Sequence, residues 1–283
     1  MKTISVEGGR FAFLEEGPMD GPVALCLHGF PDHALTFEPL LSLLGLHGFR
    51  AIAPWMRGYA PSVLEGPFDT DRLAADVIEL ANAFSPKRQV ALVGHDWGAV
   101  AAVIAAAKAP ERFGALVTMA VPHPLALAHN ITKERSQLRR SWYMMFFQLP
   151  FAERIVARND FALIDKLWVD WSPSYRASYS YMHALKQCLE KSMPCPIEYY
   201  RAIARPPALA MRRFLAAEKL SLVRVPTLHL HGEEDGCVGP RLGQGQERFF
   251  MAKFQSEVIS GVGHFLHLER PDWVGRRVLS WIG

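Results

Sequence analysis

The stretch that most constrains this chain runs from Val90 to Ala99, where an apolar segment changes abruptly into an alanine-rich one. The apolar residues before Gly94 are typical of a buried β-strand, and the residues after Gly98 are typical of a helix. Both glycines flank Asp96, as expected where a tight turn leaves no room for Cβ atoms. The pattern predicts a sharp strand-to-helix turn that lifts the Asp96 side chain above the end of a buried sheet.

The rest of the chain surrounds this turn with alternating strand-like and helix-like segments, which indicates a mainly parallel sheet. Strands are expected at 3–7, 10–15, 23–27, 50–54, 90–93, 115–121, 225–231 and 256–260. Helices are expected at 36–47, 69–84, 99–108, 241–250 and 272–282. The alternation stops at residue 123, and about the next hundred residues look helical and rich in aromatic side chains. We therefore predict an α/β core of residues 1–122 and 225–283, with a helical cap of residues 123–224 inserted after the sixth core strand.

Composition excludes several classes of function. Half of the 283 residues are hydrophobic, and a net charge of +3 does not suggest a nucleic-acid partner. The four cysteines form no CxxC pair and no metal-ligand spacing, so we expect a reduced, cytoplasmic protein without a metal or an organic cofactor. The first residues do not resemble a signal peptide, and no window approaches the roughly 18 apolar residues of a membrane span. The sequence leaves open whether the chain forms a homodimer.

Polar residues follow the predicted strands at the edge where open α/β sheets bind ligands. Asp96 follows one strand, Asp235 lies in a glycine-flanked acidic loop after another, and His264 lies in a glycine-rich turn after the last. Glu233 and Glu234 lie beside Asp235 in the same loop and compete with it for the role of the acid. The order nucleophile, acid, histidine is that of an α/β-hydrolase.

A carboxylate at the centre of the turn implies a different reaction from that of a serine. Asp96 is ionised at neutral pH and can attack an sp³ carbon directly, which forms an ester between the protein and the substrate. His264 is expected to activate the water that hydrolyses this ester, with Asp235 holding the imidazole. The backbone N–H groups of Trp97 and Phe30 are the expected donors to the oxyanion.

Displacement at carbon also needs a group that stabilises the leaving atom. For an epoxide the leaving oxygen stays attached to the substrate, so proton donors are expected to face Asp96 from the cap. Tyr143 and Tyr200 are the candidates. Trp97, Phe30 and Phe147 are expected to contact the substrate in an apolar pocket.

These motifs together resemble the epoxide hydrolases of the α/β-hydrolase fold. The core segments that carry the resemblance are 28–31, 94–98, 232–236 and 263–265. Residues 143–150 and 199–201 of the cap are similar to the family segments that carry the two ring-opening tyrosines. In that register the tyrosines are Tyr143 and Tyr200, and not Tyr199. The resemblance implies an α/β-hydrolase fold and hydrolysis of a small apolar epoxide to a vicinal diol.

Two alternatives stay open on the sequence. Haloalkane dehalogenases share the aspartate turn, but they need a halide donor, and Phe30 has no side-chain donor where an asparagine can stand in that family. Trp142, Trp168 or Trp171 of the cap could supply an indole N–H instead. The second alternative is a non-catalytic α/β-hydrolase-fold protein that binds a small ligand. Such a protein usually lacks a member of the catalytic set, whereas here all are present.

Three other polar residues are interpreted as structural. His28 is expected to support the loop that carries Phe30, and Asp32 is expected to end that loop as a turn or helix cap. His123 lies between two prolines and is expected at the hinge where the cap begins.

Overall fold

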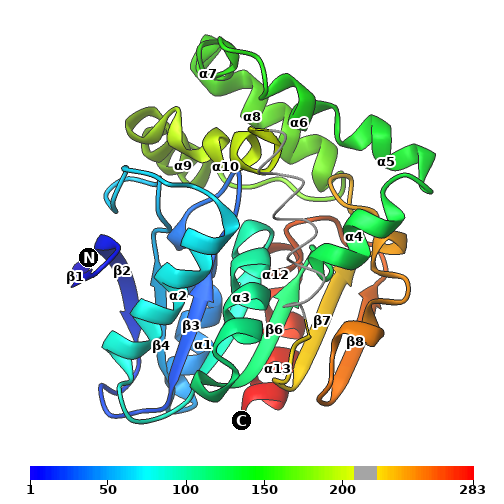
Figure 1. Ribbon diagram of the computed structural model, residues 1–283. Coiled ribbons are helices and arrows are strands. Elements are labelled where there is room, and N and C mark those ends of the chain that lie inside the picture. Colours follow the sequence, from blue (N-terminus) through cyan, green and yellow to red (C-terminus); the bar gives the residue numbers. More distant parts are fainter. Residues whose placement is uncertain (207–221) are drawn as a thin grey trace.

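The computed structural model of the chain, which describes residues 1–206 and 222–283, is built on an eight-stranded sheet (Figure 1). Its strands are β1 (Lys2–Val6), β2 (Gly9–Glu16), β3 (Val23–Leu27), β4 (Arg50–Pro54), β5 (Val90–His95), β6 (Phe113–Met119), β7 (Thr227–Gly232) and β8 (Phe254–Ile259). They are ordered β1-β2-β4-β3-β5-β6-β7-β8. Strand β2 pairs antiparallel with β1 and β4, and the other neighbouring strands of this sheet pair in parallel. The predicted mainly parallel sheet is confirmed.

Helices cover both faces of the sheet. Those of the core are α1 (Glu38–Leu46), α2 (Thr70–Phe84), α3 (Trp97–Lys108), α12 (Leu266–Glu269) and α13 (Pro271–Ile282). Helices α2 and α3 lie together on one face, whereas α1 and α13 lie on the other (Figure 1). The start of α2 is fixed by Asp69, whose side chain accepts a hydrogen bond from the Arg72 N–H. Its buried side then follows from apolar residues at helical spacing, among them Leu73, Val77 and Leu80.

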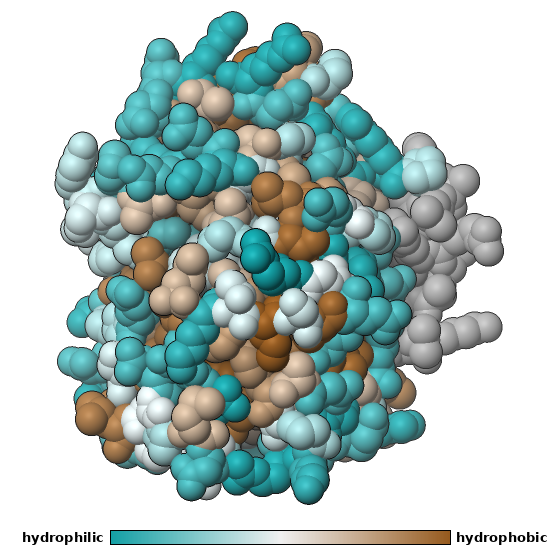
Figure 2. Space-filling view, turned by 90° about the vertical axis from the view of Figure 1, so that its left-hand side faces the viewer, coloured by the Kyte–Doolittle hydropathy of each residue, from teal (hydrophilic) through white to brown (hydrophobic). Residues whose placement is uncertain are grey.

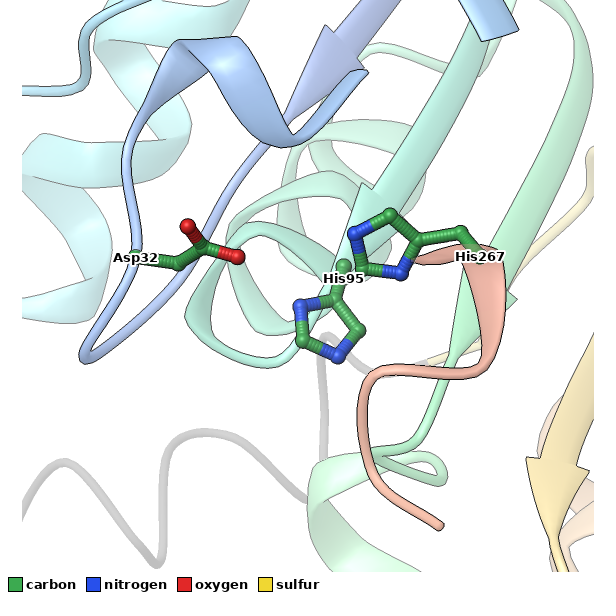
Figure 3. Close-up of side chains that lie close together, drawn as sticks. All are labelled: Asp32, His95 and His267. Atoms are coloured by element: carbon green, nitrogen blue, oxygen red, sulfur yellow. The ribbon is translucent and has the colours of Figure 1, made fainter. Parts of the chain in front are cut away.

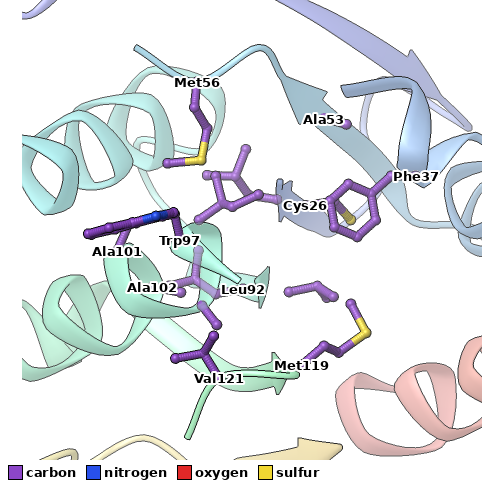
Figure 4. Close-up of a cluster of buried hydrophobic side chains, with 14 of the residues drawn as sticks. Cys26, Phe37, Ala53, Met56, Leu92, Trp97, Ala101, Ala102, Met119 and Val121 are labelled. Carbon is purple, nitrogen blue, oxygen red and sulfur yellow. The ribbon is translucent and has the colours of Figure 1, made fainter. Parts of the chain in front are cut away.

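The strands next to the turn are buried on both faces, because helices cover them from both sides. Every residue of β3 and β5 is buried. Figure 4 shows Cys26, Leu92 and Met119 of three neighbouring strands in one apolar cluster with Ala101 and Ala102 of α3. Both alanines are fully buried, and such small side chains let a helix pack closely on a sheet. The turn at Asp96 therefore stands on a densely packed base.

The chain between β6 and β7 forms a second group of helices, which we call the helical layer. It consists of α4 (Pro124–Asn130), α5 (Arg135–Arg140), α6 (Trp142–Phe146), α7 (Ala152–Val156), α8 (Arg158–Trp171), α9 (Tyr179–Ser192) and α10 (Cys195–Ala204). In Figure 1 this helical layer lies above the carboxyl ends of the parallel strands. The division of the chain at residues 123 and 224 stays a prediction, and residues 207–221 of the predicted cap lie outside the described part.

Two predicted helices differ in detail from the structure. The expected helix 241–250 is instead a pair of short 3-10 helices, Pro240–Gly243 and Gln246–Phe249, because Gly245 has a φ of 74° that interrupts the helical backbone. The helix expected from residue 36 begins as a 3-10 turn, and α1 starts only at Glu38, with Pro39 in its first turn. Proline suits that position because the first N–H groups of a helix have no partner within it.

One face of the molecule is mainly polar. The face on the left of Figure 1 carries mostly hydrophilic side chains, with small groups of hydrophobic ones near its middle (Figure 2). In the described part of the chain, no helix combines the length and the apolar character that crossing a membrane requires.

Candidate active site

Asp96 lies in the predicted sharp turn between β5 and α3. Its backbone has φ 52° and ψ −120°, a conformation that costs a non-glycine residue roughly 1–3 kcal/mol. A Cβ atom on Gly94 would lie 2.5 Å from the Gly98 carbonyl oxygen. A Cβ on Gly98 would lie 2.0 Å from the carbonyl oxygen of Leu27 in the neighbouring strand. Both positions therefore require glycine, for the reason that the sequence suggested.

The Asp96 carboxylate is held by the two backbone groups that were predicted as oxyanion donors. The Phe30 N–H donates to Asp96 Oδ1 at 2.8 Å, and the Trp97 N–H also donates to the carboxylate. Gly29 makes this approach possible, because a Cβ there would lie 2.2 Å from Asp96 Oδ1 and 2.6 Å from the Trp97 nitrogen. Gly29 lies in the segment 28–31 that carries the family resemblance, but no local pattern in the sequence indicates this role. With Oδ1 held in this way, Oδ2 is the oxygen available for reaction.

Asp235 is brought against His264, as predicted. Its Oδ2 lies 2.9 Å from His264 Nδ1, and its Oδ1 accepts hydrogen bonds from the Cys237 and Val238 N–H groups at 2.7 and 2.8 Å. Burial opposes ionisation of Asp235, but the His264 charge and hydrogen bonds from His231 and His264 outweigh it and hold the pKa of Asp235 below its ordinary value. An ionised Asp235 accepts the Nδ1 proton, which leaves the lone pair of the neutral imidazole on Nε2.

Only Asp235 of the three acidic residues in its loop is placed for this contact. Glu233 and Glu234 are exposed, whereas Asp235 is fully buried. The structure thereby distinguishes among the three candidates that the sequence left in competition.

His264 Nε2 faces Asp96 Oδ2 at a distance of 3.7 Å and has no hydrogen-bond partner within the described chain. This separation is too long for a direct hydrogen bond. Burial raises the pKa of Asp96, while the His264 charge and the Phe30 and Trp97 N–H groups oppose the increase. Burial disfavours protonation of His264, but the charges of Asp235 and Asp96 outweigh it and raise the pKa of this imidazole. The charges of Asp96 and His264 therefore each shift the pKa of the other group.

Tyr143 and Tyr200 face this carboxylate from the helical layer. Tyr143 lies in α6 and Tyr200 in α10, and their ring centroids are 5.6 Å apart. Burial raises the pKa of both phenols, and the Asp96 charge raises it further, so both keep their protons. The Tyr143 hydroxyl lies 3.3 Å from Cys237 Sγ, whereas the buried Tyr200 hydroxyl makes no hydrogen bond of ordinary geometry to the described residues, although the polar groups of Trp97 and Tyr143 lie near enough to oppose the rise of its pKa. Gln148, which the sequence argument did not single out, donates to the Tyr200 carbonyl at 2.9 Å.

A cavity of about 400 Å³ opens between the sheet edge and the helical layer. The polar groups that line it include Asp96, Tyr143 and Tyr200. The rest of the lining is mainly apolar and includes Trp97, Val100, Ile104, Leu127, Ile131 and Met144. The chemistry of this lining suits a small, mainly apolar molecule that carries one polar centre.

Phe30 and Phe147 do not line this cavity, which corrects the prediction that their rings contact a ligand there. Both side chains are fully buried, and their ring centroids lie 5.4 and 5.1 Å from that of Tyr200. The two phenylalanines therefore pack behind Tyr200 and support its ring. Phe30 meets the carboxylate through its backbone alone.

A second group of buried polar side chains lies next to His264, with Asp32 facing His95 and His267 (Figure 3). His95 Nε2 donates to the His264 carbonyl oxygen at 2.9 Å, and His267 Nε2 lies 2.6 Å from Thr36 Oγ1. Asp32 ends a turn as predicted, since its N–H donates to the Gly29 carbonyl oxygen at 3.1 Å, and its side chain also belongs to this buried group. His28 also has the predicted structural role, since its Nε2 accepts a hydrogen bond from a backbone N–H in the neighbouring loop at 3.0 Å.

Two groups of side chains in the described chain offer ligand atoms that could hold a metal ion. One is Asp32 with His95 and His267, and the other is Asp96 with Cys237 and His264. In each group the ligand atoms lie within 4.8 Å of one another. Spacing in the sequence did not reveal either group, because their members come from different strand ends.

Comparison with known proteins agrees with this architecture. The model of the alpha/beta hydrolase family matches residues 24–277. The chain is 30% identical to epoxide hydrolase 3 of Xenopus tropicalis over 286 residues, which cover 97% of this chain and 75% of that protein. It is 28% identical to the AB hydrolase superfamily protein YfhM of Bacillus subtilis, over 99% of this chain and 96% of that one. A crystal structure of Bacillus megaterium epoxide hydrolase with an inhibitor has the same fold, with a TM-score of 0.88, 23% identity and 99% coverage of both chains.

Proposed function

The chain belongs to the alpha/beta hydrolase family, and we propose that it is an epoxide hydrolase that converts a small apolar epoxide and water into a vicinal diol. The observation that carries this proposal is that one cavity of about 400 Å³ is lined by Asp96 on one side and by Tyr143 and Tyr200 on the other. A nucleophile for carbon and two donors for the departing oxygen thus face the same apolar space. The names of the similar proteins support the same reaction class.

In the first step Asp96 Oδ2 attacks one carbon of the epoxide ring. The bond between that carbon and the ring oxygen breaks, and its electron pair stays on the oxygen, which takes a proton from Tyr143 or Tyr200. The buried phenols hold their protons at neutral pH and can therefore act as donors. The product of this step is an ester between Asp96 and the substrate.

In the second step His264 Nε2 takes a proton from a water that attacks the carbonyl carbon of this ester. The oxyanion forms on Oδ1, to which the Phe30 N–H already donates, with the Trp97 N–H also directed at the carboxylate, and Asp235 stabilises the imidazolium. Collapse of the tetrahedral intermediate breaks the bond between its central carbon and the substrate oxygen, which releases the diol. One proton of the water ends on that oxygen, and the other returns to the phenolate. Loss of one oxyanion donor typically costs on the order of 10²–10³ in rate.

The cavity lining disfavours the dehalogenase alternative. None of the three tryptophans considered as halide donors, Trp142, Trp168 and Trp171, lines the cavity that contains Asp96. The Trp168 indole already donates to the Pro31 carbonyl oxygen at 3.0 Å. Among the described residues, Trp97 is then the one indole that lines this cavity, whereas two phenols suit an oxygen that remains bound to carbon.

We further infer that helices α4 to α10 act as a cap that closes the substrate cavity over Asp96. The helical layer supplies both phenols, and Gln148 ties α10 to the segment after α6. The cap boundaries at residues 123 and 224, a cytoplasmic location and a homodimer all stay predictions from the sequence.

Trapping the ester on the protein tests the proposed mechanism. A His264→Gln variant should react once with an epoxide and accumulate a covalent adduct, which intact-mass measurement and peptide mapping should locate on Asp96. Asp96→Ala is the matched control and should form no adduct. Absence of an adduct in His264→Gln, together with full activity in Asp96→Ala, contradicts the mechanism. A wild-type enzyme that releases halide from haloalkanes and leaves a panel of epoxides untouched would instead be a dehalogenase.

A further inference from the structure

Three buried ligand atoms of different chemistry converge beside the nucleophile: a carboxylate oxygen of Asp96, an imidazole nitrogen of His264 and the thiol sulfur of Cys237, all within 4.8 Å of one another. We propose that these side chains form a site for a soft divalent cation, best suited to Zn²⁺, and that the bound cation blocks the enzyme reversibly. The inhibition rests on the proposed function, whereas the binding does not.

The positions of the nitrogen and the oxygen match the dimensions of a zinc site. His264 Nδ1 faces Asp235, which leaves the Nε2 lone pair directed at Asp96 Oδ2 at 3.7 Å. Both atoms are acceptors, and Nε2 has no hydrogen-bond partner in the described part of the chain. Zinc binds nitrogen and oxygen at about 2.0–2.2 Å in tetrahedral geometry, which sets two such ligands roughly 3.4 Å apart. A shift of a few tenths of an ångström therefore suffices.

The neighbours of these ligands already orient them as a zinc site requires. A zinc-bound histidine usually donates its second N–H to a carboxylate, and His264 has Asp235 in that position at 2.9 Å. The Phe30 N–H holds Asp96 Oδ1 and leaves Oδ2 free for the cation. Binding thus needs little reorganisation of the carboxylate or the imidazole.

Cys237 determines which cation the site prefers. A thiolate together with an imidazole selects Zn²⁺ over Mg²⁺ or Ca²⁺, which prefer sites built from oxygen atoms. Coordination breaks the S–H bond and releases its proton to solvent, while a sulfur–zinc bond forms without any change of oxidation state. Binding of the cation should also change the surroundings of the Tyr143 hydroxyl, because this hydroxyl contacts the Cys237 sulfur at 3.3 Å.

One of the three ligands, Asp96, lines the cavity through which a substrate must also reach the carboxylate, whereas Cys237 and His264 are not among its lining residues. The group formed by Asp32, His95 and His267 has no comparable route, because none of the three lines that cavity. A cation bound between Asp96 and His264 occupies the nucleophilic oxygen. Zn²⁺ should therefore compete with the epoxide.

The binding is measured directly on the purified full-length enzyme, with Zn²⁺ in competition with a chelating dye and with Co²⁺ as a spectroscopic substitute. We expect one site per chain, a thiolate-to-Co²⁺ charge-transfer band in the near ultraviolet, and inhibition that added substrate or a chelator reverses. Cys237→Ser and Cys237→Ala should lose the band and weaken Zn²⁺ binding by about tenfold or more. Cys195→Ser, at a half-buried cysteine outside this group, is the matched control and should bind as the wild type does.

Wild-type binding in both Cys237 variants, or a Co²⁺ spectrum without the thiolate band, would overturn the proposed site. The two proposals fail in different ways, because dye competition and Co²⁺ spectra need no turnover. Failure of the site appears as unchanged affinity in the Cys237 variants. Failure of the proposed function appears as absent epoxide turnover in the metal-free wild type.

Discussion

The two sides of the cavity are organised in opposite ways. At the sheet edge, Phe30 and Trp97 hold the Asp96 carboxylate and Asp235 orients His264, before any ligand is bound. In the helical layer, the Tyr200 hydroxyl makes no hydrogen bond of ordinary geometry to the described residues and has only Trp97 and Tyr143 as polar neighbours, and the Tyr143 hydroxyl contacts the Cys237 thiol.

The difference follows the charges that each side must hold. The sheet edge buries an ionised carboxylate at rest, and a buried charge is tolerated only with hydrogen bonds and an opposite charge nearby. The phenols are neutral, so leaving one unsatisfied costs only about 1–3 kcal/mol. A substrate oxygen that enters the cavity can recover this energy. The arrangement indicates that the sheet edge is built in advance and that the substrate completes the helical layer.

Removing the central group of the sheet edge should have the largest effect. We expect Asp96→Ala to lose activity by about 10⁴-fold or more, because the other carboxylate among the described lining residues, Asp69, lies at the start of α2 and accepts a hydrogen bond from the Arg72 N–H. Thermal unfolding should be preserved or improved, since the variant no longer buries a carboxylate. Turnover at the wild-type rate in this variant would show that the reaction does not depend on the sheet edge. It would also contradict the division of roles between the two sides of the cavity.

Removing both phenols should affect ring opening alone. The double variant Tyr143→Phe, Tyr200→Phe should slow formation of the Asp96 ester by on the order of 10²–10⁴, as expected for loss of general-acid catalysis. Each single variant should lose less, because one donor remains. Rapid mixing followed by mass measurement reports the ester directly.

Tyr199→Phe is the matched control for the two phenols. Tyr199 is the neighbour of Tyr200 and is equally buried, but its hydroxyl donates to the Arg57 carbonyl oxygen at 2.5 Å. Its loss should lower stability by about 1 kcal/mol and leave ester formation unchanged. A double variant that forms the ester as fast as Tyr199→Phe would remove the phenols from the mechanism.

The sequence was sufficient for features that one short segment encodes. The turn at Asp96 could be predicted because its two glycines lie within five residues of each other and each is required by a backbone close approach. The sheet and the strand-end positions of Asp235 and His264 followed from periodicity and spacing for the same reason. Local signals of this kind depend on neighbours in the chain.

Features that depend on distant segments could not be read in this way. Phe147 looked like a pocket residue, but it packs against Phe30 and Tyr200 because α6, α10 and an early loop meet there. Asp32 closes the predicted turn, and the fold also places its side chain against His95 and His267, which no local pattern indicated (Figure 3). Each of these contacts spans more than fifty residues of sequence, and no periodicity reports them.

The pH profile tests the electrostatic design of the sheet edge. His264 must be neutral to take a proton from water, and its pKa is raised by Asp235 and Asp96 against the effect of burial. Ester hydrolysis should therefore decline as the pH falls through this raised value. Asp235→Asn removes the charge that favours the imidazolium, so the decline should move to lower pH while the maximum rate falls by about 10²-fold.

The exposed neighbour Glu234 offers the control for this experiment. Glu234→Gln makes the same chemical change in the same loop, but at an exposed side chain, and should leave the profile where it is in the wild type. A decline that moves to higher pH in Asp235→Asn would show that the carboxylate does not stabilise the imidazolium.

Phe147 supplies the smallest and most discriminating test, because its buried ring contacts both sides. It packs against Phe30, whose N–H is a proposed oxyanion donor, and against Tyr200. If the sheet edge is fixed by its own hydrogen bonds, Phe147→Leu should slow ester formation a few-fold through a less well placed Tyr200 and leave ester hydrolysis unchanged. The loss of packing should lower the free energy of unfolding by about 1–2 kcal/mol. Phe146→Leu, at a half-buried ring that also touches Phe147, controls for the substitution itself. Slower hydrolysis with normal ester formation would instead mean that the oxyanion loop needs the helical layer to hold its shape.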